Sequence, residues 1–555
     1  MTTSDVYLRG CIRPVSWAVL AAGVLVWAAG AAAFFRYPLF SHFNLVFGEQ
    51  GDGRMQVLLN EHLYNVLRGS AEFTSPPYFY PQQGVLGLFP AFLLSSVPYA
   101  VLRFAGCDPY VSFQLVLILL SFACAMATLV VCVRYLQIRP WIALCAAALI
   151  TFPNNLFVKA GVGHTNMLML YVIPVIVALA LWGLEDFPRI TLRSILRVAL
   201  ASALYALLFA SDVYIAWMSG LTLLIVGVVV ALALRGRLVI FLRENMRPLA
   251  ALLATAGAAF AIAFIPFLLI YMPVRALAPL RQYREYIMFA PLPIDLINVS
   301  PWNLIWGAVV ERFVANRGGE HLLAVTPVMT AVTLVLSVAL SRGAFAMERW
   351  RSVLVGAAIS TWSIGWLLTM KIGTASGFWL VRYLVPGALA IRSGMRLQLV
   401  ANIWIVIALA LLLEHWLRIA PARSIGVRRW AALGVLAFCL VEQINLMKNS
   451  EIRRSDELAF LAAVPPPPAA CQAFYALPHR QQDARYLDEQ DAMWIANQIH
   501  LPTLNGFAGW FPPGWNLLQK DGDQTSLVRQ WIEHSGLTGQ VCSYDAVKRQ
   551  WALFR

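Results

Sequence analysis

The chain has 555 residues, of which 60% are hydrophobic and 13% are charged, with a mean hydropathy of +0.68. Soluble proteins carry roughly 45–50% apolar and about 25% charged residues, so a water-soluble enzyme is excluded. The formal net charge of +14 clusters in short gaps between apolar runs, where it indicates membrane orientation. It therefore gives no reason to expect a nucleic-acid partner.

About eleven apolar stretches are long enough to cross a hydrocarbon core roughly 30 Å thick as helices. In chain order we predict these spans at residues 14–35, 110–133, 140–157, 166–184, 197–211, 213–234, 248–272, 322–341, 353–370, 398–417 and 430–447. The first is kept as a span because no convincing signal-peptide cleavage site follows it. The stretch 86–104 is interrupted by Pro90 and Pro98, and we predict that it lies along the outer membrane surface.

The basic residues fix the orientation of these spans. With a cytoplasmic amino terminus, every cytoplasmic gap is rich in arginine, as the positive-inside rule requires. The gaps are 9–13, 134–139, 189–197, 235–247, 342–351 and 418–429. The predicted protein is thus a mainly α, multi-pass membrane bundle with a cytoplasmic amino terminus.

A change of composition near residue 448 divides the predicted protein into two domains. Residues 1–448 form the transmembrane domain, with a first outer loop at 36–109, and residues 449–555 form a small α/β domain in the periplasm. Cys471 and Cys542 are the two cysteines of the exported domain, so a disulfide between them is predicted, with two free thiols as the alternative.

The first outer loop contains Asp52 between two glycines, just beyond the first span. The glycines permit a tight turn and the close approach of a ligand, so Asp52 is the candidate catalytic residue. The alternative is a simple helix cap, because aspartate is a good N-cap. Glu61, further along the same loop, is a candidate for contact with the acceptor or its sugar.

Two further outer connections carry polar residues. Lys159 and His164 lie in the loop at about 153–165, and Asp212 lies in a very short turn. Lys159 either pairs with a phosphate or extends to the membrane surface, and His164 and Asp212 either contact the acceptor and its sugar or cap helices.

The loop at about 371–397 carries Lys371, Arg382, Arg392 and Arg396, against the positive-inside bias. Guanidinium groups match phosphate oxygens, so a phosphate or pyrophosphate is the predicted partner, with anionic lipid headgroups as the alternative. Arg392 and Arg396 are four residues apart, a spacing that predicts a shared helical face before the tenth span.

Together these groups meet the needs of an enzyme that transfers a sugar from a polyprenyl-phosphate donor at the outer membrane face. Asp52 is the predicted base for the acceptor hydroxyl, and Arg392 and Arg396, with Arg382 and Lys159, are the predicted cations for the donor phosphate. The spans supply an apolar groove for the polyprenyl chain. The predicted partners are the polyprenyl-phosphate-linked sugar, a glycan or lipid acceptor, and the bilayer.

This layout resembles the GT-C superfamily of membrane glycosyltransferases and is similar to the protein O-mannosyltransferases and the lipid A aminoarabinose transferases. Those families often carry a paired acidic motif in the first outer loop, whereas Gly53 follows Asp52 here. The departure leaves open whether Asp52 acts alone and whether a divalent cation, Mg²⁺ or Mn²⁺, takes part.

The exported domain contains a stretch from Asn505 to Trp515 that is rich in tryptophan, phenylalanine, glycine and proline. It resembles a segment of uncharacterised bacterial GT-C-like proteins. Asn505 and Trp510 are therefore candidates for sugar binding, since aromatic rings stack on sugar faces, and an aromatic core of the small domain is the alternative.

Two other functions fit the same membrane topology. One is an O-antigen ligase or polymerase, which uses a whole glycan on a polyprenyl-pyrophosphate carrier. The other is a transporter or flippase for a lipid-linked saccharide, for which repeated halves with broken helices at equivalent positions are expected. The sequence shows no convincing internal repeat, and its polar groups lie in loops on one face instead of at the membrane midplane.

Overall fold

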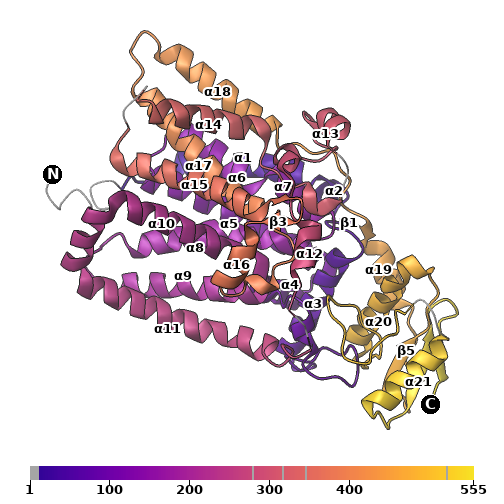
Figure 1. The fold of residues 1–555 in the computed structure, drawn as a ribbon. Helices are drawn as coiled ribbons and strands as arrows, with labels where there is room; N and C mark the ends of the chain where they lie inside the picture. The colour runs from indigo at the N-terminus through magenta and orange to yellow at the C-terminus, as the bar shows by residue number, and fades with distance from the viewer. Residues whose placement is uncertain (1–11, 278–279, 315–317, 344–346, 520–522) are drawn as a thin grey trace.

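The structure, a computed structural model, describes residues 12–277, 280–314, 318–343, 347–519 and 523–555. The predicted basic cluster at 9–13 lies largely outside these residues. The described part of the chain is mainly helical, and the long helices run side by side in one bundle (Figure 1).

Within the described residues, nine helical segments are long and apolar enough to cross a membrane. They are α1 (Trp17–Phe34), α5 (Pro109–Val130, continued to Tyr135), α6 with α7 (Pro140–Thr151 and Asn154–Gly161), the 3₁₀ helix η5 with α8 (Thr165–Tyr171 and Val172–Gly183), α9 (Leu192–Ser211), α10 (Val213–Glu244), α11 (Met246–Tyr271), α15 (Arg349–Thr369) and α17 (Leu397–Arg418). The chain is a multi-pass membrane protein.

The two other predicted spans correspond to shorter helices, α14 (Pro327–Ser341) and α18 (Ile425–Val441), so eleven spans stay a prediction. The stretch 86–104 contains α4 (Leu93–Phe104), a helix of 12 residues. At 1.5 Å per residue, α4 is about 18 Å long and too short to cross the hydrocarbon core by itself.

Side-chain caps fix where several long helices begin. Asp108 caps α5 by accepting the N–H of Tyr110 at 3.0 Å, and Pro109 follows it at the first helical position. Thr191 caps α9 in the same way. At the centre of the bundle, α17 packs against α15, α14 and α6 and is buried along most of its length.

Shorter elements gather at one end of the bundle, at the opposite end from the α10–α11 connection (Figure 1). They are α2 (Arg36–Phe40), α3 (Asp52–Leu67), α12 (Tyr283–Phe289), α13 (Gly307–Phe313), α16 (Phe378–Leu384), the hairpin of β2 (Lys371–Ile372) and β3 (Ala375–Ser376), and strand β1 (Leu45–Val46). The loops and short helices of this end carry Asp52, His164, Arg382, Arg392 and Arg396, which were predicted from the sequence.

The carboxy-terminal region continues from this end of the bundle (Figure 1). Strand β4 (Ile452–Arg453) pairs with β1, and α19 (Arg454–Ala462), α20 (Arg485–Ile499) and α21 (Gln524–Ser535) surround a three-stranded sheet. In that sheet, β5 (Ala473–Ala476) is parallel to β6 (Val541–Asp545), and β6 is antiparallel to β7 (Gln550–Leu553). Helix α20 packs on α3, so the region contacts the first predicted outer loop directly.

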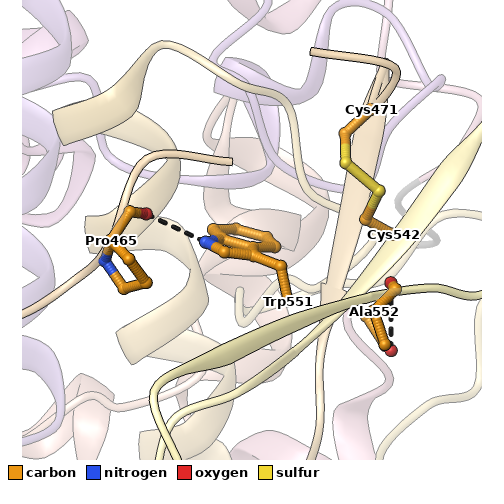
Figure 2. The surroundings of a disulfide bond; sticks show 6 residues. Pro465, Cys471, Cys542, Trp551 and Ala552 are labelled. Carbon is orange, nitrogen blue, oxygen red and sulfur yellow. Dashed lines mark hydrogen bonds between the residues drawn. A yellow bond between two sulfur atoms is a disulfide. The ribbon is translucent and has the colours of Figure 1, made fainter. Parts of the chain in front are cut away.

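A disulfide joins Cys471, just before β5, to Cys542 in β6 (Figure 2). Beside it, the indole N–H of Trp551 donates to the carbonyl of Pro465 at 2.9 Å and ties β7 to the proline-rich segment. The disulfide and this hydrogen bond attach the sheet to the segment that connects α19 to β5.

We expect the double substitution of Cys471 and Cys542 by serine to lower the thermal unfolding midpoint of the purified protein in lipid nanodiscs. The disulfide spans 71 residues, and removing a disulfide from a small exported domain costs about 2–5 kcal/mol because the unfolded chain gains freedom. Differential scanning fluorimetry measures the midpoint, and Cys107→Ser serves as a matched control at a free cysteine. Equal midpoints for the double variant and wild type would show that the bond contributes no stability.

Candidate functional site

Asp52 is the first residue of α3, and its carboxylate does not cap that helix in the described structure. Glu49 takes that role, since its carboxylate accepts the N–H groups of Gly51 and Asp52, each at 2.5 Å. The side chain of Asp52 is 55% exposed. Its carboxylate therefore remains accessible to a ligand, which favours the functional interpretation of Asp52 over the capping one.

His164 lies between two carboxylates. Its Nδ1 is 3.1 Å from Oδ2 of Asp52, and its Nε2 is 3.2 Å from Oε1 of Glu320. The preceding Gly163 has φ of +109°, and a Cβ there would lie 2.9 Å from the carboxylate of Glu49. A glycine is thus needed for the loop to bring the imidazole to Asp52.

Glu320 is the centre of a buried ion cluster. The ammonium of Lys159 is 2.8 Å from its Oε1, and the guanidinium of Arg396 donates from Nε to its Oε2 at 3.0 Å and from Nη2 to its Oε1. The two cationic side chains are only 2% and 5% exposed. Burial acts to raise the pKa of Glu320, but the charges of Arg396 and Lys159 outweigh it and hold the pKa well below its usual range.

This geometry contradicts one of the two interpretations of Lys159, and its pairing with a donor phosphate stays a prediction. The residue lies in α7 with its side chain directed into the protein and paired with Glu320, so it does not extend to the membrane surface. A buried ammonium requires a charged partner, and Glu320 provides it.

Asp212 is buried beside the same cluster. Its carboxylate accepts the N–H of Ile215 at 2.9 Å, which caps α10, and the side-chain amide of Asn166 at 2.6 Å. The guanidinium of Arg396 lies 4.3 Å from the ring centre of Tyr214. Asp212 thus has the capping role and also lies close to the site.

The prediction that Arg392 and Arg396 share a helical face is wrong. Residues 391–395 are not helical, and α17 begins only at Leu397. Tertiary contacts determine the backbone of this segment. Glu320 binds the Arg396 guanidinium, and the chain at Gly394 packs so closely on Tyr286 that a Cβ there would lie 2.4 Å from the tyrosine hydroxyl.

Arg392 and Arg382 have other partners than the ion cluster. The guanidinium of Arg392 lies 4.8 Å from the ring centre of Phe289. Arg382 donates from Nη2 to the carbonyl of Arg281 at 2.7 Å. Both arginines belong to the same group of loops, and their role in donor binding stays a prediction.

Glu61 and Trp510 likewise have partners outside the ion cluster. Glu61 accepts from Arg103 and Tyr99 at 2.8 and 2.7 Å and joins α3 to α4. Trp510 lies beneath the guanidinium of Arg281, with 4.1 Å between the guanidinium carbon and the ring centre. The second contact connects the carboxy-terminal region to the loop before α12.

Asn505 is part of a buried network in the carboxy-terminal region. Its side-chain amide donates to Glu489 at 3.0 Å, and its carbonyl oxygen accepts the N–H of Ala476 at 2.8 Å. Burial raises the pKa of Glu489 to about 7, despite the hydrogen bonds from Gly506 and Asn505. These contacts favour a structural role for Asn505.

The sequence did not point to Glu320 or to Tyr486. Burial and the nearby charges of Glu49, Glu451 and Asp52 raise the pKa of Tyr486, which places this residue of α20 near the exposed acid. The side chain of Tyr486 also lies against Phe507, with ring centres 5.3 Å apart. The carboxy-terminal region therefore contributes to the surroundings of Asp52.

Two groups of side chains offer ligand atoms of the kind that divalent cations bind. The carboxylates of Glu49 and Asp52 are neighbours, and oxygen ligands suit Mg²⁺ and Mn²⁺. In the carboxy-terminal region, ligand atoms of His479, Asp488 and Asp491 lie within 4.8 Å of one another, but Arg480 already binds both aspartates at 2.7 and 2.6 Å. The first group is also engaged, because the Glu49 carboxylate accepts the N–H groups of Gly51 and Asp52.

The sequence matches no protein-family model and no curated protein. In structure, the chain is similar to the oligosaccharyltransferase of Archaeoglobus fulgidus. Against its apo form the TM-score is 0.50 at 14% identity, covering 95% of this chain and 69% of that chain. Against its complex with Zn and sulfate the TM-score is 0.48 at 14% identity, covering 94% and 67%.

The chain has the GT-C fold. The resemblance inferred from its loops and spans is thereby confirmed at the level of fold. In this GT-C fold, the first loop, α7 with the turn that follows it, the loop carrying Glu320 and the residue before α17 meet around one exposed acid and two buried cations.

We expect Glu320→Gln to destabilise the protein strongly, because it leaves Lys159 and Arg396 buried together without a counter-charge. Breaking a buried ion pair by removing one partner costs about 3–5 kcal/mol. The double variant Lys159→Met with Glu320→Gln removes one of the two cations and should regain part of the loss. Thermal unfolding of wild type, Glu320→Gln, Lys159→Met and the double variant measures this coupling, and additive effects of the two substitutions would contradict it.

We expect the stability of the protein to fall between pH 4.5 and about 7 through Glu489. The raised pKa means that the folded protein holds this proton while the unfolded chain, with a pKa near 4.5, releases it. The contribution is therefore fully present below pH 4.5 and is lost as the pH rises through 7. Glu489→Gln keeps the acceptor oxygen without the charge, so its unfolding midpoint should exceed that of wild type at pH 8 and approach it at pH 5. A constant difference at both pH values would contradict the assignment.

Proposed function

We propose that this chain is a membrane glycosyltransferase that moves a sugar from a polyprenyl-phosphate donor to a glycan or lipid acceptor. The reaction takes place at the periplasmic face of a bacterial inner membrane, on the side that holds the carboxy-terminal domain of residues 449–555. The GT-C fold supports the class of enzyme, and the orientation rests on the basic gaps of the sequence.

One observation carries the proposal: an exposed carboxylate and two buried cations meet at one point. Asp52, His164, Glu320 and Arg396 are connected by contacts of 3.0–3.2 Å, and Lys159 joins Glu320 at 2.8 Å. The residues come from distant parts of the chain.

The chemistry assigns a separate role to each group. The acceptor hydroxyl oxygen attacks the anomeric carbon of the sugar, its proton passes to Asp52, and the bond from the anomeric carbon to the phosphate oxygen breaks. Lys159 and Arg396 stabilise the charge that develops on the departing polyprenyl phosphate. Lys159 and Arg396 together carry one more charge than Glu320, and the nearby Asp52 carboxylate balances that charge until the acceptor proton reaches Asp52. His164 orients Asp52.

As an alternative to Asp52 acting as a free base, the carboxylates of Glu49 and Asp52 would hold a divalent cation, Mg²⁺ or Mn²⁺. Such an ion would supply a further positive charge beside a donor phosphate. Arg392 and Arg382 lie in the neighbouring loops and are proposed as additional contacts to the donor. The bilayer itself accommodates the polyprenyl chain.

A second candidate is the transfer of a whole glycan from a polyprenyl-pyrophosphate carrier. The similarity in fold to an oligosaccharyltransferase favours it, because that name denotes transfer of an oligosaccharide. The two candidates differ in the donor. Turnover of a single sugar on undecaprenyl phosphate supports the first, and turnover of only an oligosaccharide on undecaprenyl pyrophosphate supports the second.

We expect Asp52→Asn to lower the rate of donor turnover by about 10²–10⁴-fold, the usual contribution of a general base. The assay follows the release of undecaprenyl phosphate from a panel of synthetic undecaprenyl-phosphate sugars, with membrane glycan extract as acceptor, in Mg²⁺, in Mn²⁺ and in EDTA. Because Asp52 is exposed, the variant should unfold at the wild-type temperature.

The control for this experiment is Glu72→Gln, which removes an exposed acid from the same loop. It should turn over donor at the wild-type rate. Full activity of Asp52→Asn would remove Asp52 from the mechanism and with it the proposed site.

A further inference from the structure

The backbone next to Asp52 is held by a residue from the carboxy-terminal region. The side chain of Gln490 in α20 is fully buried and donates from Nε2 to the carbonyl oxygen of Gly51 at 3.0 Å. The same carbonyl accepts the N–H of Met55 at 3.1 Å, which is the first hydrogen bond of α3. Gln490 therefore contacts the point at which the helix carrying Asp52 begins.

A second contact from α20 follows two residues after Asp52. Arg54 is 4% exposed, and its guanidinium forms salt bridges with Asp491 at 2.6 Å and with Glu457 of α19 at 2.8 Å. Glu457 also accepts the hydroxyl of Tyr110 at 2.9 Å. The buried Arg54 is thus held by two carboxylates of the carboxy-terminal region. One of them, Glu457, is also bonded to α5 through Tyr110.

These two contacts enclose Asp52 along the chain, at residues 51 and 54. The Asp52 side chain is itself mostly exposed, so the direction of its carboxylate depends on how firmly the first turn of α3 is held. The first turn of a helix is prone to fray, because its N–H groups lack partners within the helix. In α3, Glu49 accepts the N–H groups of Gly51 and Asp52, and Gln490 adds a contact to the carbonyl of Gly51. A displacement of about 1 Å in a catalytic group is enough to cost 10²-fold in rate.

We propose that Gln490 and Asp491 are positioning residues for Asp52, so that α20 contributes to the geometry of the site. The inference rests on the proposed function in so far as Asp52 is the base. The positioning itself is a property of the fold and is measurable without any substrate.

The chain contains a matched control for Gln490. Asn497, two turns further along α20, donates from its side-chain amide to the carbonyl of Leu58 in α3 at 3.2 Å. Both bonds are buried, both join a side-chain amide of α20 to a backbone carbonyl of α3 or its cap, and only the first lies beside Asp52. Loss of either bond weakens the α3–α20 contact, but only loss of the first releases the start of α3.

The experiment compares Gln490→Met and Asn497→Leu, each of which replaces the amide by an apolar group of similar size. Both proteins are purified as the full chain in nanodiscs. Hydrogen–deuterium exchange should show at least tenfold faster exchange of the amide of Met55 and its neighbours in Gln490→Met, and wild-type exchange there in Asn497→Leu. Equal exchange at Met55 in the two variants would overturn the proposal.

A second readout is the kcat and KM of each variant with the undecaprenyl-phosphate sugar that the wild-type protein uses. Protein stability does not by itself determine these constants. Gln490→Met should lower kcat at least tenfold with the KM for donor within twofold, whereas Asn497→Leu should keep both constants within twofold. Similar kcat values in the two variants would contradict positioning. If wild type turns over none of the donors, the proposed function fails, and the exchange at Met55 still decides the positioning.

A second pair of variants covers the case in which Gln490→Met does not fold. Asp491→Asn weakens the hold on Arg54, and Asp488→Asn removes an equal charge from the same helix face, where Asp488 binds Arg480 but not Arg54. The proposal expects faster exchange near Met55 and a lower kcat in the first variant only. Identical behaviour of the two variants would overturn it.

Discussion

The site depends on one constraint: two cations can be buried side by side only if a carboxylate lies between them. Lys159 and Arg396 meet this condition through Glu320, which contacts both. The three residues belong to α7, to the loop before α14 and to the approach to α17, so satisfying the charges forces these three segments to close on one point. The contact with Glu320 places His164 at the same point, and the contact with His164 places Asp52 beside it.

Hydropathy predicted most of the bundle because a membrane span is a local signal. The stretches expected at 14–35, 213–234 and 398–417 contain α1, α10 and α17, with ends that differ where a cap or an extended helix moves the boundary. Asp52, Lys159 and His164 were predicted from an equally local signal. Each is a polar group in a connection between apolar spans, where polar side chains are unusual enough to be noticed.

The rest of the site has no local signal. Nothing in the sequence distinguishes Glu320 from another loop acid such as Glu285, because its role comes from cations 161 and 76 residues away. The spacing of Arg392 and Arg396 predicted a shared face, but spacing has that meaning only inside a helix, and the approach to α17 is not helical. Gln490 is likewise unremarkable until the fold places it against Gly51.

The sequence has a break in composition near residue 448, but the contacts show that this position is not an energetic boundary. Arg54 is buried in the first loop, yet both of its carboxylate partners lie beyond the break. Strand β1 has its only paired partner among the described residues in β4, also beyond the break. A chain ending at the break would leave a buried guanidinium without a counter-charge, a state that costs several kcal/mol. The first loop and the carboxy-terminal region must therefore fold as one unit, which is why the exposed acid at the start of α3 depends on residues more than four hundred positions away.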